Sequence, residues 1–402
     1  MRKSMELDAA IGMMGQMEAH PRKETVPLEQ ALERVLAEDM HAVFPMPPFD
    51  KSPFDGFALN AEDIPGTLPI SGAIAAGDQE VPPLVRGTAV RIFTGSPIPE
   101  GANVVVKQEK TVYTQTQVEV SFSAAPGTNI IKAGEEFETG TLLARAGEKL
   151  TPAMLGVLAS QGYSELSVWR KPRVAILSTG SELARPGTPR PAYGIYNSSY
   201  YTLRGYLEKM GFEVEPPRIL PDDAEGIANA VEERMDSDAD LVITTGGASV
   251  GDYDYALATA RKIGAEILFW KVRMKPGGAL LVSQRGDKVL LGLSGNPAAA
   301  IMSILTVLQP YLRKLTGSNL RNRELELPIY QDMPKTSFGT RVLRGCFLVE
   351  NEKTYFAERE GRSNGNISSF HGCSLIGVIP GGSQPVRRGQ RIRVFQLPPD
   401  LG

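Results

Sequence analysis

The segment LVITTGGASVGDYDY, residues 241–255, has residue types suited to binding a phosphate together with a cation. Its apolar and β-branched beginning predicts a buried strand, which stops at Gly246 and Gly247. A glycine-rich turn after a parallel strand lets a ligand approach backbone N–H groups. Asp252 and Asp254 follow. Because carboxylates repel a phosphate, their presence beside one suggests a bound cation. We expect a phosphate-bearing ligand and a divalent metal here; a strand-to-helix turn with a solvated acidic face is the alternative.

Two further segments, STGSE (178–182) and LSGNPAAA (293–300), also end predicted strands with small residues. In a parallel sheet such ends share one edge, so the three loops are expected to meet in one crevice. Asn296 suits the N-cap and Pro297 the first position of a long helix. The free N–H groups and dipole of that helix would favour an anion, although ordinary capping also explains the Asn-Pro pair.

Three cations alternate with apolar residues in FWKVRMKPGG: Lys271, Arg273 and Lys275. Strand periodicity would place them on one face of a strand over 266–273 and its continuation. Such a row favours a bound polyanion, and an exposed edge strand protected by charge is the alternative. Two earlier segments by themselves predict only turns or hairpins. They are FDKSPFDGFAL around Asp55 and RIFTGSPIPEG around Thr94.

The composition narrows the class of protein. The 402 residues are 42% hydrophobic and 22% charged, with a net charge of -3, which is typical of a globular protein without nucleic-acid or anionic-membrane partners. No apolar signal or membrane-spanning run is present, so we expect a cytoplasmic protein. Two cysteines and three scattered histidines provide neither a disulfide framework nor a structural transition-metal site.

The order of predicted elements indicates a multidomain α/β and β protein. Two helical patterns come first, the second on the stripe Leu28, Leu32, Val35 and Leu36, and a further helix is predicted over 152–161. Strands then alternate with helices, which predicts a doubly wound, mostly parallel sheet. The expected domains are a helical and linking part (1–45 and 141–171), a β-rich insertion (46–140), an α/β domain (172–318) and a small C-terminal β-barrel or sandwich (319–402).

Seven motifs in order resemble the molybdopterin molybdenumtransferase family, of the MoeA type and similar to the gephyrin E domain. They are PPFDKSPFDGFA, RIFTGSPIPEGANVVV, GTNIIKAGEEF, RVAILSTGSEL, TTGGASVGDYDY, WKVRMKPGG and GLSGNPAAA. The resemblance implies a homodimer whose α/β domain binds the pterin. It also implies Mg²⁺-dependent insertion of molybdate into adenylylated molybdopterin with release of AMP. A molybdopterin adenylyltransferase and molybdoenzymes are the implied partners.

The resemblance further implies roles for individual residues. Those matched to catalytic positions are Asp55, Thr94, Glu136, Glu182, Asp222, Asp254, Lys271 and Lys275. Glu182, Asp222 and Asp254 are the expected Mg²⁺ ligands, because this hard cation takes a few carboxylates and several waters. The implied pterin and phosphate contacts are Gly180, Gly246, Gly247, Ser249, Gly251, Asp252, Arg273, Gly277, Ser294, Gly295, Asn296 and Pro297.

The chain departs from the family pattern at five positions. They are Ile131 for arginine, Glu136 for aspartate, Ser181 in the family's GDE, Gly278 for the lysine of KPGKP and Ser294 for the proline of LPGNP. Each lost cation removes a charge-assisted contact worth about 1.5–3 kcal/mol.

These departures leave several readings of the function open. Lys132, Arg273 or an arginine near 341–344 or 362 could replace a lost cation. An active transferase for molybdate or tungstate is the first reading. A non-catalytic paralogue that carries molybdopterin or finished cofactor to a partner enzyme is the second.

Overall fold

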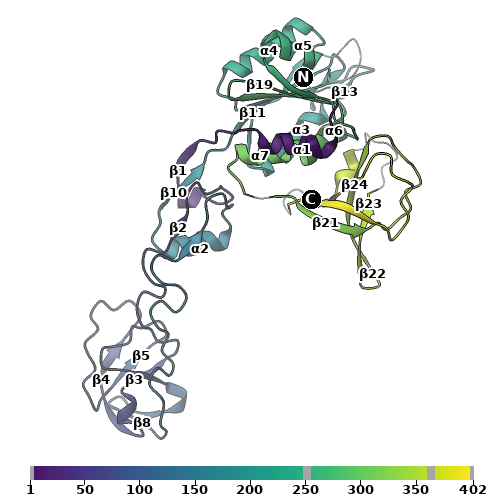
Figure 1. The fold of residues 1–402 in the computed structure, drawn as a ribbon. Coiled ribbons are helices and arrows are strands. Elements are labelled where there is room, and N and C mark those ends of the chain that lie inside the picture. The colour runs from purple at the N-terminus through teal and green to yellow at the C-terminus, as the bar shows by residue number, and fades with distance from the viewer. Residues whose placement is uncertain (1–3, 248–254, 320, 360–366, 399–402) are drawn as a thin grey trace. The chain divides into compact units, whose positions relative to one another are not determined.

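The computed structural model describes residues 4–247, 255–319, 321–359 and 367–398 (Figure 1). Contacts divide the chain into two compact units. The larger comprises Met1–Glu38, Ala146–Thr151 and Glu165–Gly402, and the smaller comprises Asp39–Arg145 and Pro152–Ser164. No helix among the described residues is both long and apolar enough to cross a bilayer.

The larger unit contains the predicted doubly wound sheet. Its strands lie in the order β14 (Glu213–Val214), β11 (Arg173–Thr179), β16 (Leu241–Thr245), β20 (Lys288–Leu293), β19 (Leu280–Arg285) and β17 (Glu266–Trp270), with β15 (Arg218–Leu220) also on β11. The pairs from β14 and β15 through β20 are parallel, and β19 runs antiparallel between β20 and β17. Chain order reverses beside β11, so the carboxyl ends of β11 and β16 form a switch point, where open α/β sheets bind ligands.

Helices cover both faces of this sheet because its strands are apolar on both sides. Alternate residues of β11, Val174 and Ile176, join the core with α1 (Leu7–Gln16), α3 (Ser198–Lys209) and the 297–315 helix. Their neighbours Ala175 and Leu177 join the opposite core with α4 (Ala224–Asp236) and α5 (Tyr255–Lys262) (Figure 1). The long helix predicted from Pro297 is confirmed as α6 (Pro297–Ser303), a π-helical turn (Ile304–Leu308) and α7 (Gln309–Leu315).

The smaller unit is β-rich, as the texture of its sequence predicted. Its main sheet has the order β6 (Val104–Lys107), β3 (Gly56–Leu59), β5 (Ala89–Ile92), β4 (Gly66–Ile74), β8 (Gln117–Val120) and β7 (Val112–Tyr113). β2 (Met40–His41) pairs separately with β9 (Leu142–Ala144). The predicted helix after Thr151 is confirmed as α2 (Pro152–Ser160), with Gly162 in the left-handed conformation beyond its end.

The prediction of a second N-terminal helix, based on the apolar stripe from Leu28 to Leu36, is wrong. Only one 3-10 turn forms, Leu28–Gln30, and Leu32 is 48% exposed. Glu33 has a φ of 62°, which a continuous helix excludes. Val35 and Leu36 instead bridge Lys149 and Val168, because those distant segments supply their backbone hydrogen-bond partners. In the same unit β1 (Lys23–Pro27) pairs with β10 (Glu165–Trp169).

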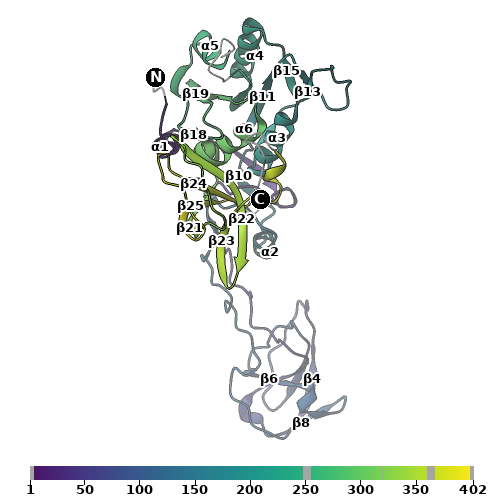
Figure 2. The same ribbon diagram turned by 90° about the vertical axis from the view of Figure 1, so that its right-hand side faces the viewer.

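The C-terminal region folds as the predicted small β structure. Its strand order is β18 (Met274–Lys275), β22 (Thr340–Glu350), β24 (Leu375–Ile379), β25 (Arg391–Gln396) and β21 (Arg323–Pro328), with β23 (Lys353–Glu358) on the other edge of β22 (Figure 2). A bridge from Ile329 to Phe356 joins the end of β21 to β23, which curls the sheet towards a barrel. The four predicted domain ranges remain a prediction.

Candidate functional site

The three small-residue loops converge on one crevice. A cavity of about 520 Å³ is lined by Gly180 after β11, by Gly246 and Gly247 after β16, and by Gly295 and Pro297 after β20. All of these strands are parallel neighbours, so their carboxyl ends open on the same edge of the sheet. The predicted meeting of the loops is therefore confirmed for the described residues.

Close backbone packing holds these loops together. Gly246 donates its N–H to the Leu293 carbonyl at 3.2 Å. A Cβ on Gly246 would lie 2.5 Å from the carbonyl oxygen of Thr179, and its φ is 95°. A Cβ on Gly295 would in turn lie 3.3 Å from the Gly246 Cα. Gly246 is required because its positive φ and the Thr179 carbonyl leave no room for a side chain, whereas the contact at Gly295 is tight.

Two of the predicted acids face the crevice, and a third lies outside the described residues. Glu182 and Asp222 line the cavity. The Ser181 N–H donates to Asp222 Oδ2 at 2.9 Å, and the Asp222 N–H donates to Ser181 Oγ at 3.2 Å. Ser181, a departure from the family pattern, thus fixes the loop that presents Asp222. Four predicted residues have no described structure: Ser249, Gly251, Asp252 and Asp254.

The charge of the crevice suits a hard cation. Its described lining contains two carboxylates and no lysine, arginine or histidine. Mg²⁺ is commonly held by one or two carboxylates with waters and phosphate oxygens, so Glu182 and Asp222 fit such an ion. No group of three His, Cys, Asp or Glu side chains that could hold a metal is found in the described part of the chain.

The predicted helix cap is confirmed at the crevice. Asn296 Oδ1 accepts the N–H groups of Ala298 and Ala299 at 3.0 and 3.3 Å, with Pro297 opening the helix. The Asn296 N–H donates to Ser294 Oγ at 3.2 Å, so the serine that replaces the family's proline fixes the approach to the helix. This end of the helix faces the cavity through Pro297.

The opposite wall was not identified from the sequence. It includes Ile195, Tyr196, Asn197, Ser198 and Ser199. They connect β13 (Ile195–Tyr196), which pairs with β12 (Leu183–Ala184), to α3. Asn197 caps α3, and Ser199 Oγ donates to the Gly295 carbonyl at 3.2 Å. The Asn-Ser-Ser sequence before a predicted helix was the available signal, because it is a typical capping pattern.

The single cationic strand face predicted for Lys271, Arg273 and Lys275 is wrong. Strand β17 ends at Trp270, and Lys271 has a φ of 71°, which breaks the strand period. The Lys271 ammonium lies 4.0 Å from the Trp270 ring centroid. The chain then leaves the α/β sheet, because Lys275 pairs with Arg341 in the C-terminal sheet.

The proposed replacement cations Lys132 and Arg273 each pair with an acid. Lys132 Nζ lies 2.7 Å from Asp50, and Arg273 Nη1 lies 2.8 Å from Glu6. Neither Arg273 nor Gly277 lines the crevice. A Cβ on Gly277 would lie 3.0 Å from the Ala299 carbonyl oxygen, so this turn packs on α6.

A second polar cavity, of about 650 Å³, lies where Lys275 meets the C-terminal sheet. Four cations line it, Lys275, Lys335, Arg341 and Arg344, together with Asp332 and Glu358. Burial lowers the pKa of Arg344, while Cys373 and Glu358 act in the opposite direction. The Arg344 guanidinium lies 5.3 Å from the Phe370 ring centroid. Local sequence patterns offer no basis for choosing among these arginines, since the cavity depends on pairing between distant segments.

Asp55 and Thr94 come together in the smaller unit. The Thr94 N–H and hydroxyl donate to Asp55 Oδ1 at 2.8 and 2.9 Å. These two hydrogen bonds lower the pKa of Asp55, and Arg91 acts in the same direction. Glu136 is exposed, and its N–H donates to the Met46 carbonyl at 2.9 Å. Asp55 is thus held as a carboxylate at the end of a well-ordered turn.

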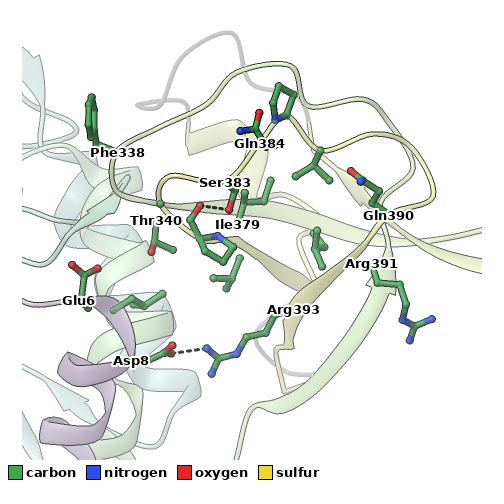
Figure 3. Close-up of a pocket in the computed structure, with 17 residues that line it drawn as sticks. Glu6, Asp8, Phe338, Thr340, Ile379, Ser383, Gln384, Gln390, Arg391 and Arg393 are labelled. Carbon is green, nitrogen blue, oxygen red and sulfur yellow. Dashed lines mark hydrogen bonds and ion pairs between the residues drawn. The ribbon is translucent and has the colours of Figure 1, made fainter.

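Cavity size alone does not identify the site. A cavity of about 750 Å³ lies between α1 and the C-terminal sheet, where the ion pair of Asp8 and Arg393 closes one side (Figure 3). Phe338, which is fully exposed, stands at another edge. None of the predicted site residues lines this cavity.

Comparisons with known proteins identify the family of this chain. Residues 5–162 match the model of the MoeA N-terminal region (domain I and II), and 175–314 match a probable molybdopterin binding domain. The molybdopterin molybdenumtransferase of Staphylococcus aureus is 33% identical over 380 residues, which are 92% of this chain and 90% of that protein. The chain belongs to the MoeA family.

Other MoeA relatives agree over nearly the whole length. The molybdopterin molybdenumtransferase of Staphylococcus epidermidis is 31% identical, covering 98% of this chain and 96% of its own. A crystal structure of a molybdopterin biosynthesis MoeA protein from Pyrococcus horikoshii has a TM-score of 0.82 at 26% identity, covering 98% of this chain and all of that one. The crevice falls entirely inside the segment that matches the molybdopterin binding domain.

Proposed function

We propose that this chain is a molybdopterin molybdenumtransferase whose crevice binds adenylylated molybdopterin and that AMP leaves as molybdate enters the pterin's dithiolene. The observation that carries this proposal is the meeting of three glycine-bearing strand ends with two carboxylates in one cavity. A ligand with adjacent phosphates and a bound cation matches that combination of backbone donors and acids.

The backbone of the crevice binds the phosphates. The loops after β16 and β20 carry glycines at the crevice, where a phosphate can come close to the backbone, and the 297–315 helix adds the positive end of its dipole. Tyr196 and Ile195 on the facing wall bound the space left for an aromatic ring. These groups orient the phosphoanhydride and shield it from bulk water.

Glu182 and Asp222 are the residues that would hold Mg²⁺, with Asp254 as the expected third ligand. When bound, the cation supplies charge neutralisation and polarisation of the phosphate that departs with AMP. The protein's own contribution is positional. The reciprocal hydrogen bonds of Ser181 and Asp222 fix one carboxylate. Water is the proposed nucleophile.

The remaining predicted residues complete the proposal. Lys271 and Lys275 are assigned to phosphate and oxyanion, and Asp55, Thr94 and Glu136 to the catalytic set from the smaller unit. The functional state is a homodimer, which light scattering would report as twice the chain mass of 43.5 kDa. A molybdopterin adenylyltransferase supplies the substrate, and molybdoenzymes receive the product.

AMP release from adenylylated molybdopterin tests this function directly. The full chain is mixed with Mg²⁺ and with molybdate, with tungstate, or with neither, and AMP and active cofactor are quantified. Oxyanion-dependent release with formation of active cofactor is the expected result. Tight pterin binding without AMP release under any condition would instead establish a cofactor carrier.

A further inference from the structure

We propose that Cys346 and Cys373 are a redox-sensitive thiol pair, which a peroxide converts to an intramolecular disulfide. The 402-residue sequence contains no other cysteine, and both are free thiols in the structure. They lie outside the seven motifs and outside the crevice, so this inference goes beyond the proposed function and does not depend on it.

Strand register brings the two cysteines together. The antiparallel ladder between β22 and β24 ends at the pair of Gly345 and Leu375. Beyond this pair the Ser374 N–H still donates to the Gly345 carbonyl at 3.0 Å. Cys346 directly follows Gly345 and Cys373 directly precedes Ser374, so the two cysteines flank this last hydrogen bond. Facing residues on antiparallel strands have Cα atoms about 4.5–5.5 Å apart, and a disulfide spans about 4.4–6.8 Å.

Both cysteines lie on the same face of the C-terminal sheet. Side chains alternate along β22, where Leu343 packs in the core of the C-terminal sheet and Val342 in the core shared with the α/β domain. Cys346 is separated from Val342 by an even number of residues along the strand, so it shares the face of Val342. Cys373 is buried in that same shared core. The two thiols therefore meet on one side of the sheet.

The two thiols differ in their access to an oxidant. Cys346 is partly exposed, whereas Cys373 is fully buried. Burial raises the pKa of the Cys373 thiol, and the nearby Cys346 thiol acts in the same direction. Backbone hydrogen bonds with Gly345 and Leu375 oppose this rise in the pKa, and the first of them puts the Cys373 sulfur beside the residue that precedes Cys346. Oxidation follows exposure and thiolate character, so a peroxide reacts first with Cys346.

One hydrogen peroxide oxidises one pair of thiols. The Cys346 thiolate attacks a peroxide oxygen, the O–O bond breaks, and Cys346 becomes a sulfenic acid while the other oxygen leaves as water. The Cys373 thiol then attacks the Cys346 sulfur, which forms the S–S bond and releases the sulfenic oxygen as a second water. Two electrons pass from the two thiols to the peroxide.

The disulfide fastens β22 to a turn that packs against α3. The Cys373 N–H donates to the Phe370 carbonyl at 3.0 Å. Phe370 is buried, and its ring lies edge-on to that of Tyr206 on α3, with the ring centroids 6.3 Å apart. The first turn of α3 forms part of the crevice wall. Oxidation therefore acts beside the contact between the C-terminal sheet and the α/β domain.

Mass spectrometry of the full chain after treatment with hydrogen peroxide tests the pair. The wild type should lose two hydrogens and yield one crosslinked peptide that contains Cys346 and Cys373, and dithiothreitol should reverse the change. In Cys373→Ser the sulfenic acid of Cys346 has no partner thiol, so dimedone should trap about tenfold more of it than in the wild type. Cys346→Ser is the matched control, because its single buried thiol should resist the same peroxide.

Three results would overturn the pair. The first is a wild type that keeps both thiols after peroxide, and the second is a wild type that gives as much dimedone adduct as Cys373→Ser. The third is a disulfide between two copies of the chain through Cys346 in place of the intramolecular bond. The crosslinked peptide of the wild type decides the question even where the buried Cys373→Ser variant fails to fold. AMP release by the reduced protein is measured separately, so the proposed function and the thiol pair stand or fall independently.

Discussion

The crevice and the cationic cavity present charge to a ligand in opposite ways. The crevice offers backbone N–H groups and two carboxylates, so a phosphate there needs a metal ion as a partner. The cavity offers ammonium and guanidinium groups, so an oxyanion there needs no metal. This difference teaches that the crevice suits an anion that arrives with a cation, whereas the cationic cavity suits an anion alone.

The two regions also differ in how they tolerate change. Backbone donors at β11, β16 and β20 are fixed by the parallel ladder, and a substitution there acts mainly through sterics. The cationic cavity is lined by side chains from the turn at Lys275, the 332–337 loop and β22, so a substitution there acts mainly through charge.

The largest expected effect comes from removing a crevice carboxylate. Asp222→Asn should lower AMP release about a hundredfold, because it removes a ligand charge while retaining the hydrogen bond with Ser181. Affinity for adenylylated molybdopterin should change little, and rapid-quench measurements with separate binding titrations distinguish the two quantities. The adjacent Asp223→Asn is the control, since Asp223 caps α4, asparagine caps equally well, and Asp223 is outside the crevice lining. Unchanged AMP release in Asp222→Asn would show that Asp222 has no part in the reaction.

The next effect is steric and lies on the backbone of the crevice. Gly246→Ala should lower the free energy of unfolding by about 3 kcal/mol, because its Cβ would meet Thr179 and its φ is positive. Gly264→Ala is the matched control, with positive φ but open space, and should cost about 1 kcal/mol. Urea denaturation measures both. Equal losses for the two variants would mean that the loops are not tightly packed.

A smaller steric effect is expected beside the cavity. Gly278→Lys restores the family residue, yet it should destabilise the chain by about 1–3 kcal/mol, because two carbonyl oxygens occupy the Cβ position. Urea denaturation measures this loss. A Gly278→Lys variant as stable as the wild type would contradict the steric account of this turn.

The smallest effect concerns Asp55, an acid that is stabilised mainly by hydrogen bonds, with a smaller contribution from Arg91. The pKa of Asp55 lies below its ordinary 3.8, mainly through the Thr94 N–H and then its hydroxyl. Thr94→Val should raise this pKa while leaving it below 3.8, because the N–H remains. A lowered folded-state pKa stabilises the protein above the unfolded value, and this stabilisation is lost as pH falls through the folded pKa. Carbon-13 NMR of labelled aspartate follows the titration, and an unchanged pKa would show that the hydroxyl contributes nothing.

The crevice was predictable because its signals are local. Apolar strands ending in glycine at 180, 246 and 295, and the Asn296 cap, are each contained within a few residues of sequence. Parallel topology then places them together by a general rule. The opposite wall of the crevice, residues 195–199, has an equally local signal in its Asn-Ser-Ser capping pattern, but it was not predicted.

The elements that were predicted incorrectly depend on pairing between distant segments. Leu28, Val35 and Leu36 have helical spacing, but bridges to the 149–168 region determine the backbone there. Lys271 to Lys275 have strand spacing, but the chain turns at Lys271 to join β22. Neither partner could be inferred from a period within one segment, so the cationic cavity emerged only from the three-dimensional arrangement.

One experiment tests most directly whether the crevice carries the chemistry. AMP release is titrated with Mg²⁺ for the wild type, Asp222→Asn and the control Asp223→Asn. The proposed function predicts that Asp222→Asn shifts the Mg²⁺ curve to higher concentration and that Asp223→Asn leaves it unchanged. A curve for Asp222→Asn that coincides with the wild-type curve would contradict a metal-dependent site in the crevice.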